Sequence, residues 1–474
     1  MNKSYSNLFN SSFWLLTIGV FCALILPQLV QDGMFLDGVF YASISKNLAH
    51  HLGTFWNLHY SQTFYSSLHE QPPLMFWLQG QFFGLFGDSI YVERIYSFLT
   101  AIITAFGINL IWKEIFRNNN DLKQHGWLPV LFWIIIPICF WSYINNLEEC
   151  TMSLFDVFAI YFIIKAINKD KIIYLLLGGS FIFLASFTKG IQGLFPLIIL
   201  SLRYFINKDI SFKKSFIYSL IVLLIPTLLY LYFYSNPIIR ESYHQYFHRR
   251  LVLTFGNNET TTFRFYLLLR LILELIPVLL ITFISIILLR KKFPSKDYFT
   301  NHNKDILFFL LIGLSASLPL MITLEQRGFY LTTSFPYFAI AFAIIAAPFL
   351  SSQIKSVSPK IFKGIKAISI TLLIGTLVIT SMQIGTTKRD EEMLHDIYLI
   401  GKEIPPQTII SSDRDLFYDW KLQAYFQRLC NISLDEDSLR TYHLIEKQNP
   451  KTTAPANYSK INLSTLKYDI YKKQ

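Results

Sequence analysis

The chain has 474 residues, of which 53% are hydrophobic and only 15% are charged, against roughly 25% charged residues in soluble globular domains. The apolar residues occur in long uncharged runs, so the composition excludes a water-soluble enzyme and indicates a polytopic membrane protein. The formal net charge is +11, but the lysines and arginines are dispersed in short clusters beside the apolar runs. This distribution is typical of membrane topology and predicts no nucleic-acid partner.

Uncharged windows long enough to cross a bilayer begin near the N-terminus, because a crossing helix needs about 20 apolar residues. The clearest windows are 12–30, 95–112, 127–147, 172–188, 215–239, 306–324, 328–350 and 367–387. Three weaker windows are shortened or carry one acid, at 150–168, 190–202 and 271–289. The first window lacks a small-residue cleavage site after it and is predicted to be a retained anchor. The sequence predicts an α-helical membrane protein with about eleven transmembrane helices.

The number of spans could be twelve or thirteen, and the uncharged segment 72–87 is the first candidate for an additional one. Its two prolines and three glycines are poor residues for a lipid-exposed span, and its length is marginal. A helix lying at the membrane surface is therefore the favoured interpretation, and a short span is the alternative.

Lysine and arginine clusters fall in alternate loops, which predicts that these loops are cytoplasmic. The basic loops cover residues 113–123, 165–171, 203–214, 290–304 and 355–366. Three loops and the tail are then predicted to lie outside: 32–90, 143–149, 236–264 and the residues after 387.

The composition becomes charged after residue 387, which predicts two domains. Residues 1–387 form the transmembrane domain with its long first outer loop 32–90, and residues 388–474 form a small soluble α/β domain. In that domain 407–412 is predicted to be a strand and 415–428 a helix with Leu416 and Trp420 inward, followed by a strand near 429–434.

Acidic residues at the outer ends of spans are the first candidates for chemistry. Asp37 precedes a helical pattern, where it could be a helix N-cap or a general base at the mouth of a cavity. The adjacent Glu148 and Glu149 could be solvated loop acids, or could share a proton or hold a cation. Asp156 and Glu274 lie inside spans, where an ionisable group is costly unless it faces a cavity or a hydrogen-bond partner.

Basic residues on the outer side are the second set of candidates. Arginine and lysine pair strongly with phosphate oxygens, so an anionic lipid headgroup would explain them; snorkelling at the membrane interface is the alternative. The residues are Lys189, Arg240, Arg249, Arg250 and Arg327, with Tyr330 close by. The sequence has no P-loop, dinucleotide-binding or zinc-protease motif in a suitable context, so soluble nucleotide chemistry is not predicted.

Several short motifs follow one another along residues 12–350. Asp37 precedes Tyr41, and then come HEQPPL (69–74), LFGDS, ERIYS, TKG (188–190) and QRGFYLTTSFP (326–336). In this order and spacing they resemble the GT-C fold membrane glycosyltransferases of the dolichyl-phosphate-mannose-protein mannosyltransferase and lipid A aminoarabinose transferase superfamily (glycosyltransferase family 39/83-like). The tail motif DWKLQAYFQR is similar to the outer domain of bacterial members.

The resemblance implies inverting transfer of a hexosyl or pentosyl group from a polyprenyl phosphate, such as undecaprenyl phosphate, to a lipid, glycan or protein. It implies an active site and tail on the periplasmic face of the inner membrane, among membrane lipids. Asp37 is implied as the base that deprotonates or orients the acceptor. Glu149, with Glu148 beside it, is implied as a second acid that in some members is linked to a divalent metal ion; no other cofactor is implied.

The resemblance also implies binding residues. The donor phosphate would be held by Lys189, Arg327, Tyr330 and Gln71. The substrates would contact Tyr41, His69, Glu70 and Arg94. Gln71 is a departure, because lipid A-type members usually carry lysine there and an amide donates hydrogen bonds to phosphate without adding charge.

Two other classes of protein share the many-span composition. A transporter or lipid flippase is the main alternative, although such proteins tend to show paired halves and ionisable groups at the bilayer midplane. A membrane scaffold whose tail binds a partner is the third interpretation.

Overall fold

The structure is a computed structural model that describes residues 3–248, 260–289, 296–354, 358–448 and 454–474. Arg249 and Arg250 lie outside the described residues. The chain divides into two compact units, each described here by itself. The helical unit comprises Met1–Leu29, Ser97–Ile144 and Glu148–Met382, and the loop–tail unit comprises Val30–Tyr96, Asn145–Leu147 and Gln383–Gln474. The first outer loop and the tail thus fall in one compact unit, and the predicted division at residue 387 stays a prediction.

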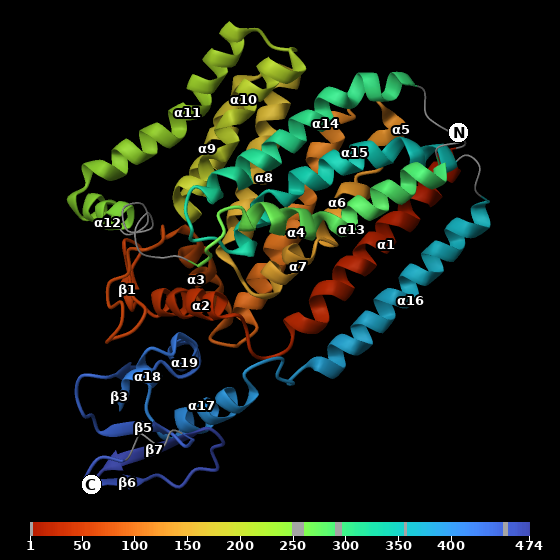
Figure 1. Cartoon of the computed structure of the whole chain (residues 1–474). Coiled ribbons are helices and arrows are strands. Elements are labelled where there is room, and N and C mark those ends of the chain that lie inside the picture. Colours follow the sequence, from red (N-terminus) through yellow and green to blue (C-terminus); the bar gives the residue numbers. More distant parts are fainter. Residues whose placement is uncertain (1–2, 249–259, 290–295, 355–357, 449–453) are drawn as a thin grey trace. The chain divides into compact units, whose positions relative to one another are not determined.

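The helical unit consists of long helices joined by shorter helical segments (Figure 1). They are α1 (Lys3–Leu29), α4 (Val92–Ile115, which starts in the loop–tail unit), α5 (Asn120–Lys123), α6 (Trp127–Ile134), α7 (Pro137–Ile144), α8 (Glu148–Lys169), α9 (Ile172–Lys189), η1 (Gly190–Ile198), α10 (Ile199–Leu202), η2 (Arg203–Asn207), α11 (Phe212–Ser235), α12 (Pro237–Phe247), α13 (Tyr266–Leu289), α14 (Lys296–Ser317), η5 (Leu318–Met321), η6 (Gly328–Thr333), α15 (Phe335–Ile354) and α16 (Pro359–Gln383).

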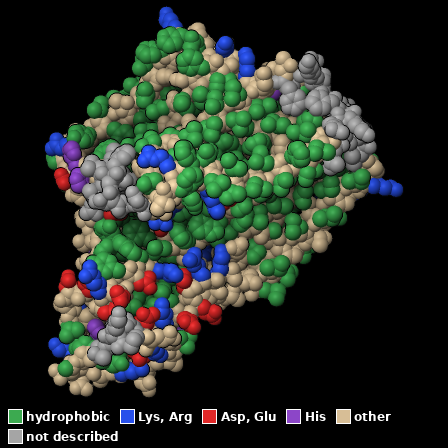
Figure 2. Space-filling view, in the orientation of Figure 1, with side chains coloured by type: hydrophobic (Ala, Val, Ile, Leu, Met, Phe, Trp, Pro, Cys, Tyr) green, Lys and Arg blue, Asp and Glu red, His purple; other side chains and the backbone are tan. Residues whose placement is uncertain are grey.

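Within the described ranges, eight helices are long and apolar enough to cross a membrane, and a bent pair makes a ninth. Helices satisfy their own backbone hydrogen bonds, which is what a lipid environment demands. Figure 2 shows hydrophobic side chains covering the helices on this face, and acidic side chains gathered mainly on the C-terminal domain. The predicted class, a polytopic helical membrane protein with a small C-terminal sheet domain, is confirmed, and the predicted number of spans is roughly consistent.

The predicted span 127–147 is the bent pair. Helices α6 and α7 meet at 75°, and Pro137 starts α7. At the start of α7 the backbone N–H of Ile138 donates to Glu274 Oε2 of α13, at 2.8 Å. The intramembrane acid Glu274 therefore has a structural role, because it satisfies a backbone group at a helix start.

The predicted spans 172–188 and 190–202 are one continuous helical run, Ile172–Asn207. At Gly190 the α-helix α9 gives way to the tighter helix η1, with a backbone φ of +73°. A side chain at position 190 would be strained by this φ and would collide with the Tyr246 hydroxyl of α12, 1.7 Å from the position of a Cβ. Glycine is therefore required where the chain turns after Lys189.

The N-terminal part of the loop–tail unit contains α2 (Leu36–Ala49), the two-residue strands β1 (Gly53–Thr54) and β2 (Asn57–Leu58), and α3 (Leu74–Phe86). Helix α3 packs against α2. With 13 residues it is about 20 Å long, too short for a hydrocarbon core of about 30 Å. This length favours the surface interpretation of 72–87.

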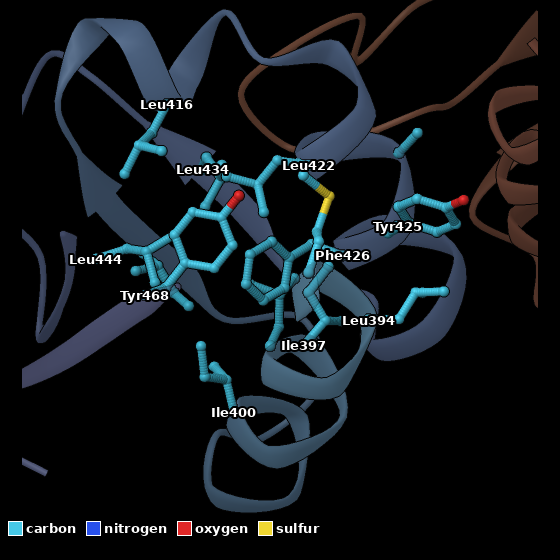
Figure 3. Packing of buried hydrophobic residues seen from close by; sticks show 14 of the residues in the cluster. Leu394, Ile397, Ile400, Leu416, Leu422, Tyr425, Phe426, Leu434, Leu444 and Tyr468 are labelled. Carbon is cyan, nitrogen blue, oxygen red and sulfur yellow. The ribbon is translucent and has the colours of Figure 1, made fainter. Parts of the chain in front are cut away.

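The C-terminal domain is α/β, as predicted. Its elements are α17 (Glu391–Glu403), β3 (Ile409–Ser412), α18 (Arg414–Phe417), α19 (Trp420–Tyr425), η7 (Phe426–Cys430), β4 (Ser433–Asp435), β5 (Tyr442–Glu446), β6 (Tyr458–Lys460) and β7 (Tyr468–Lys473). The strand order is β4-β3-β5-β7-β6; β3 is parallel to β4 and β5, and β7 is antiparallel to β5 and β6. Apolar side chains from the helices and the sheet form one core (Figure 3).

The predicted helix 415–428 is broken, and the prediction of an inward Trp420 is wrong. The Asp419 carboxylate caps a new helix start by accepting from the N–H groups of Lys421 and Leu422. This break changes the phase of the following turn, so Leu422 is buried and Trp420 is 36% exposed. Its ring instead lies edge-on to Phe64 of the first outer loop, with ring centroids 4.6 Å apart.

Candidate functional site

Three charged residues that the sequence indicates as candidates, Lys189, Glu148 and Glu149, lie together in the helical unit. Lys189 Nζ lies 2.7 Å from Glu149 Oε1 and 3.4 Å from Glu148 Oε2. Both glutamates are fully buried, and the lysine side chain is 10% exposed. A lysine and two carboxylates so far from bulk water interact strongly, because the local dielectric is low.

The packing of two helices brings this cluster together. Helix α8 begins with Glu148 and Glu149, and α9, which packs along α8, ends with Lys189. A helix start favours negative charge and a helix end favours positive charge. Both helix dipoles therefore stabilise the observed arrangement.

Tyr330 is the fourth member of the cluster. The Lys189 ammonium lies 5.3 Å from the centre of the Tyr330 ring, in a cation–π contact. The Tyr330 hydroxyl donates to Glu325 at 3.4 Å, and its backbone carbonyl accepts from Gln192 at 3.1 Å. The predicted phosphate-binding residues Lys189 and Tyr330 are thus neighbours.

The loop that carries Arg327 and Tyr330 is fixed by Gln326. The Gln326 side chain donates to the carbonyls of Arg264 and Thr323, and accepts from the N–H of Leu267. These bonds tie the QRGFY motif to the start of α13. The Arg327 side chain itself is exposed, which leaves its guanidinium available to an anion.

Arg270 is a cation of this region that the sequence analysis missed. Gly328 packs so closely on it that a Cβ there would lie 3.2 Å from Arg270 Nε. Arg270 Nη2 pairs with Glu274 at 2.6 Å, while its Nε makes no hydrogen bond within the described part of the chain. The spacing Arg270–Glu274, one helical turn, is the sequence signal that could have revealed it.

The residues around Glu149 do not fit a bound divalent metal ion. Such an ion needs several oxygen or nitrogen ligands. Over residues 3–248, 260–289, 296–354, 358–448 and 454–474, no group of three or more His, Cys, Asp or Glu side chains could hold one. The Lys189 ammonium also lies against the Glu149 carboxylate, where it would repel a second cation. We assign no chemical step to a metal.

Asp37 lies in the loop–tail unit, in the first turn of α2. The N-cap residue is Phe35 and makes no side-chain cap, so Asp37 is not the N-cap. Gly38 allows the start of α2 to approach the backbone of Asn145 closely, because a Cβ at position 38 would lie 2.0 Å from the Asn145 carbonyl oxygen. The half-buried Asp37 carboxylate benefits from the positive end of the helix dipole.

The predicted substrate residues of the first outer loop lie in the same unit as Asp37. Tyr41 is buried, and its ring lies edge-on to Phe76 at 5.8 Å. His69 Nε2 is 2.8 Å from Ser67 Oγ, and Glu70 accepts from the Tyr65 hydroxyl at 2.6 Å. Gln71 is half-buried. Their roles stay predictions.

Arg94 is buried among protein groups. Its guanidinium lies 3.9 Å from Asp32 and 3.5 Å from Glu93, and it donates to the backbone carbonyls of Ile90 and Gly33. These contacts give Arg94 a structural place in the loop–tail unit. A contact with substrate stays a prediction.

Two further candidates lie in the helical unit. Asp156 is fully buried in α8, and neither of its oxygens makes a hydrogen bond with a described residue. Arg240 of α12 is exposed, with its guanidinium 5.9 Å from the centre of the Tyr234 ring. The structure gives neither residue a place in the Lys189 cluster.

Lys46 of α2 is a buried titratable group that the sequence analysis did not single out. Its ammonium donates to the backbone carbonyls of Gln427 and Arg428 at 3.3 and 2.7 Å. Burial, and secondly the charge of Arg428, lower the pKa of Lys46 to about 8. Three nearby groups oppose this shift: Asp88, Cys430 and Glu93.

This pKa predicts a pH-dependent stability. An unfolded lysine keeps its proton up to about pH 10.5, so between pH 8 and 10.5 the unfolded chain binds more protons than the folded one. The free energy of unfolding therefore rises with pH across this window, by about 3 kcal/mol. Thermal unfolding in detergent should show a rise in wild type that Lys46→Met lacks; equal pH profiles for the two proteins would contradict the shift.

Comparisons with known proteins identify structures with a similar fold. A sequence model of the family described as dolichyl-phosphate-mannose-protein mannosyltransferase matches residues 70–233. The structure matches crystal structures of ArnT from Cupriavidus metallidurans. With the undecaprenyl phosphate complex the TM-score is 0.63 at 12% identity, over 97% of each chain. With the apo state it is 0.63 at 11% identity, over 96% of this chain and 95% of the other. A search of curated protein sequences finds no match.

A third match is the archaeal oligosaccharyltransferase AglB from Archaeoglobus fulgidus, with a TM-score of 0.48 at 13% identity, over 90% of this chain and 64% of the other. The ArnT matches extend over nearly the whole chain, both units included. The chain therefore has the GT-C fold that the motif resemblance implies, with the C-terminal domain as part of it.

Proposed function

We propose that the chain is an integral-membrane glycosyltransferase. It moves a sugar from a polyprenyl-phosphate donor to a lipid, glycan or protein acceptor at the periplasmic face of the inner membrane, with inversion at the sugar carbon. The observation that carries the proposal is the fold match over 97% of the chain to a protein crystallised with undecaprenyl phosphate. The mannosyltransferase family match over residues 70–233 supports the same reaction class.

The cations of the helical unit support a binding site for the donor phosphate. Lys189 and Tyr330 are in contact. Arg327, three residues before Tyr330, is exposed. Arg270 packs on Gly328, which lies between Arg327 and Tyr330 in the sequence. We assign Lys189, Arg327 and Tyr330 to the donor phosphate and add Arg270 to this set. Guanidinium and ammonium groups bind phosphate through strong charge-assisted hydrogen bonds.

The reaction needs two contributions from the protein. An acceptor oxygen attacks the anomeric carbon from the face opposite the phosphate, and its proton passes to the Asp37 carboxylate. The bond between the anomeric carbon and the phosphate oxygen breaks, and the polyprenyl phosphate leaves with the bonding electrons. The cations stabilise the charge that develops on the leaving phosphate. Glu149, with Glu148 beside it, holds Lys189 in place.

Binding of undecaprenyl phosphate tests the phosphate site. Arg327→Gln removes one exposed guanidinium and is expected to weaken binding about ten- to hundredfold, since one charge-assisted hydrogen bond is worth about 1.5–3 kcal/mol. Native mass spectrometry of the purified protein, titrated with undecaprenyl phosphate, measures the affinity. The matched control Arg117→Gln removes an exposed arginine near the end of α4. Equal affinities of wild type and Arg327→Gln would contradict the assignment.

One observation favours the alternative, a transporter or lipid flippase. Asp156 is a buried intramembrane acid without a hydrogen-bond partner in the described part of the chain, and such acids often mark transport pathways. Proteoliposomes separate the two functions. Movement of a lipid-linked sugar across the bilayer without any glycosylated product would support the flippase and contradict the transferase.

A further inference from the structure

The segment that leads into Asp37 is bound to the chain that follows the last span. In the loop–tail unit, the Asp32 N–H donates to the Thr386 carbonyl at 2.8 Å, and the Lys388 N–H donates to the Asp32 carbonyl at 2.9 Å. Asp32 and Thr387 thereby form a parallel β-bridge. The tail thus fixes the backbone five residues before Asp37.

Tyr425 of the C-terminal domain makes the second attachment. Its ring belongs to the domain's apolar core, and its hydroxyl points out of that core (Figure 3). The hydroxyl accepts from the Met34 N–H at 2.9 Å and lies 3.0 Å from the Met34 carbonyl and 3.1 Å from Asp390 Oδ2, either of which can take its proton. One side chain therefore lies within hydrogen-bond distance of both backbone groups of a residue three positions before Asp37.

A buried ion network makes the third attachment. Arg428 Nε and Nη2 donate to the two carboxylate oxygens of Glu93 at 3.1 and 2.7 Å, and Arg428 also donates to the carbonyls of Asp88 and Ser89. Arg428 and Glu93 are each about 3% exposed. A paired, bidentate contact of this kind fixes geometry, and breaking it leaves an unpaired buried charge.

Asp32 joins this network to the segment before Asp37. Its carboxylate accepts from the Tyr398 hydroxyl of α17 at 2.5 Å and lies 3.9 Å from Arg94, which neighbours Glu93. Met34 and Val39, on either side of Asp37, are also members of the C-terminal domain's core cluster. The attachments of Asp32, Met34 and Val39 thus end in the tail or at the start of α4, while Phe35 and Gly38 are bound by Asn145 and Asn146 of the same unit.

We propose that the C-terminal domain is a positioning element for the catalytic loop, and that Tyr425 and Arg428 set the place of Asp37. The inference rests on the proposed function, because it gives Asp37 the role of base. Helix α2 begins at Leu36, so a displacement of Met34 is transmitted to Asp37 through one helical turn. The domain acts on the reaction through this segment and needs no contact with substrate.

The test removes one hydroxyl group, because deleting the domain would expose the core that Met34 and Val39 share with it. Tyr425→Phe keeps the ring in the core and frees the Met34 backbone. Tyr458→Phe is the matched control, since its hydroxyl bonds to the Arg440 carbonyl within the domain. Hydrogen–deuterium exchange of the purified full chain and turnover in proteoliposomes are measured for both. Turnover is read as free undecaprenyl phosphate released from a bacterial lipid extract.

In Tyr425→Phe, amide exchange over residues 32–40 is expected to be about tenfold faster, as for the loss of one or two hydrogen bonds. Exchange in β3, β5 and β7 should be unchanged. Turnover is expected to fall ten- to hundredfold, since small displacements of catalytic groups are costly, with unchanged affinity for undecaprenyl phosphate.

If Tyr425→Phe exchanged its amides over residues 32–40 at the wild-type rate, or turned over at the wild-type rate, the proposal would be overturned. Faster exchange throughout the domain would also overturn it, because it would indicate a general loss of stability. The exchange measurement does not depend on the reaction. An inactive wild-type protein would therefore contradict the proposed function, while exchange would still decide whether Tyr425 holds this segment.

Discussion

Replacing Asp37 by asparagine is expected to reduce sugar transfer about a thousandfold while the protein still folds and inserts. The amide has nearly the same shape but cannot accept the proton of the attacking hydroxyl, and general base catalysis contributes about 10²–10⁴-fold. Mass spectrometry of envelope lipids, glycans and proteins measures the effect. Cells with the wild-type chain should show a sugar-sized mass increase on one component, and cells with Asp37→Asn should lack it.

Asp88→Asn is the matched control for Asp37→Asn. Asp88 belongs to the same loop–tail unit, and its half-exposed carboxylate pairs with His50 at 2.8 Å. Exposed pairs of this kind contribute roughly 0–1 kcal/mol, so this variant should keep both folding and transfer. Full transfer by Asp37→Asn would remove the base from the proposed mechanism.

Replacing Lys189 by methionine is expected to damage both stability and transfer. The variant leaves the fully buried Glu148 and Glu149 without the ammonium that lies between them. Removing one partner of a buried ion pair costs about 3–5 kcal/mol. The amount of folded protein, measured by size-exclusion chromatography after heating in detergent, should fall sharply, and binding of undecaprenyl phosphate should be lost.

Two further variants separate the structural and functional roles of Lys189. Adding Glu149→Gln to Lys189→Met removes one buried charge and should restore much of the folded protein, without restoring undecaprenyl phosphate binding. Lys165→Met is the matched control, because that ammonium lies over the rings of Tyr161 and Tyr174 near the end of α8, away from the Glu148–Glu149 pair at its start. Wild-type stability of Lys189→Met would show that the cluster is unimportant for the fold.

The spans could be predicted because hydropathy is a local property of the sequence, whereas the bend at Pro137 could not. A proline in a span interrupts the hydrogen bonds between backbone groups of the helix. Whether the helix bends there depends on which other groups of the protein satisfy the backbone groups that lose their partners. Here the partner is Glu274, 136 residues away. The sequence indicates that Glu274 is a possible hydrogen-bond partner, but no local pattern connects it to Ile138.

The members of the proposed phosphate site and the acids beside it could be predicted better than their arrangement. Lys189 and Glu149 stand out singly as charges near the ends of apolar runs, but their contact arises from the packing of α8 on α9. The sequence does not distinguish Arg270 as a site residue, because a single arginine near the start of a span resembles an ordinary interfacial residue. Its position against Gly328 depends on a loop more than fifty residues later in the chain.

The shared core of the first outer loop and the tail has no sequence signature. Tyr425 and Met34 are 391 residues apart, and either segment alone reads as an ordinary polar connection. The α/β class of the tail was predictable from its alternating strands. The inward face of its central helix was not, because the cap at Asp419 restarts the helix and turns Trp420 outward.

Release of free undecaprenyl phosphate tests the central claim most directly, because this product is the same whatever the sugar and the acceptor are. Purified chain in proteoliposomes is supplied with a bacterial lipid extract that contains lipid-linked sugars and with envelope material as acceptor. Mass spectrometry should show free undecaprenyl phosphate rising together with a glycosylated product for wild type, and neither for Asp37→Asn. Equal release by both proteins, or release by neither, would contradict the proposed sugar transfer.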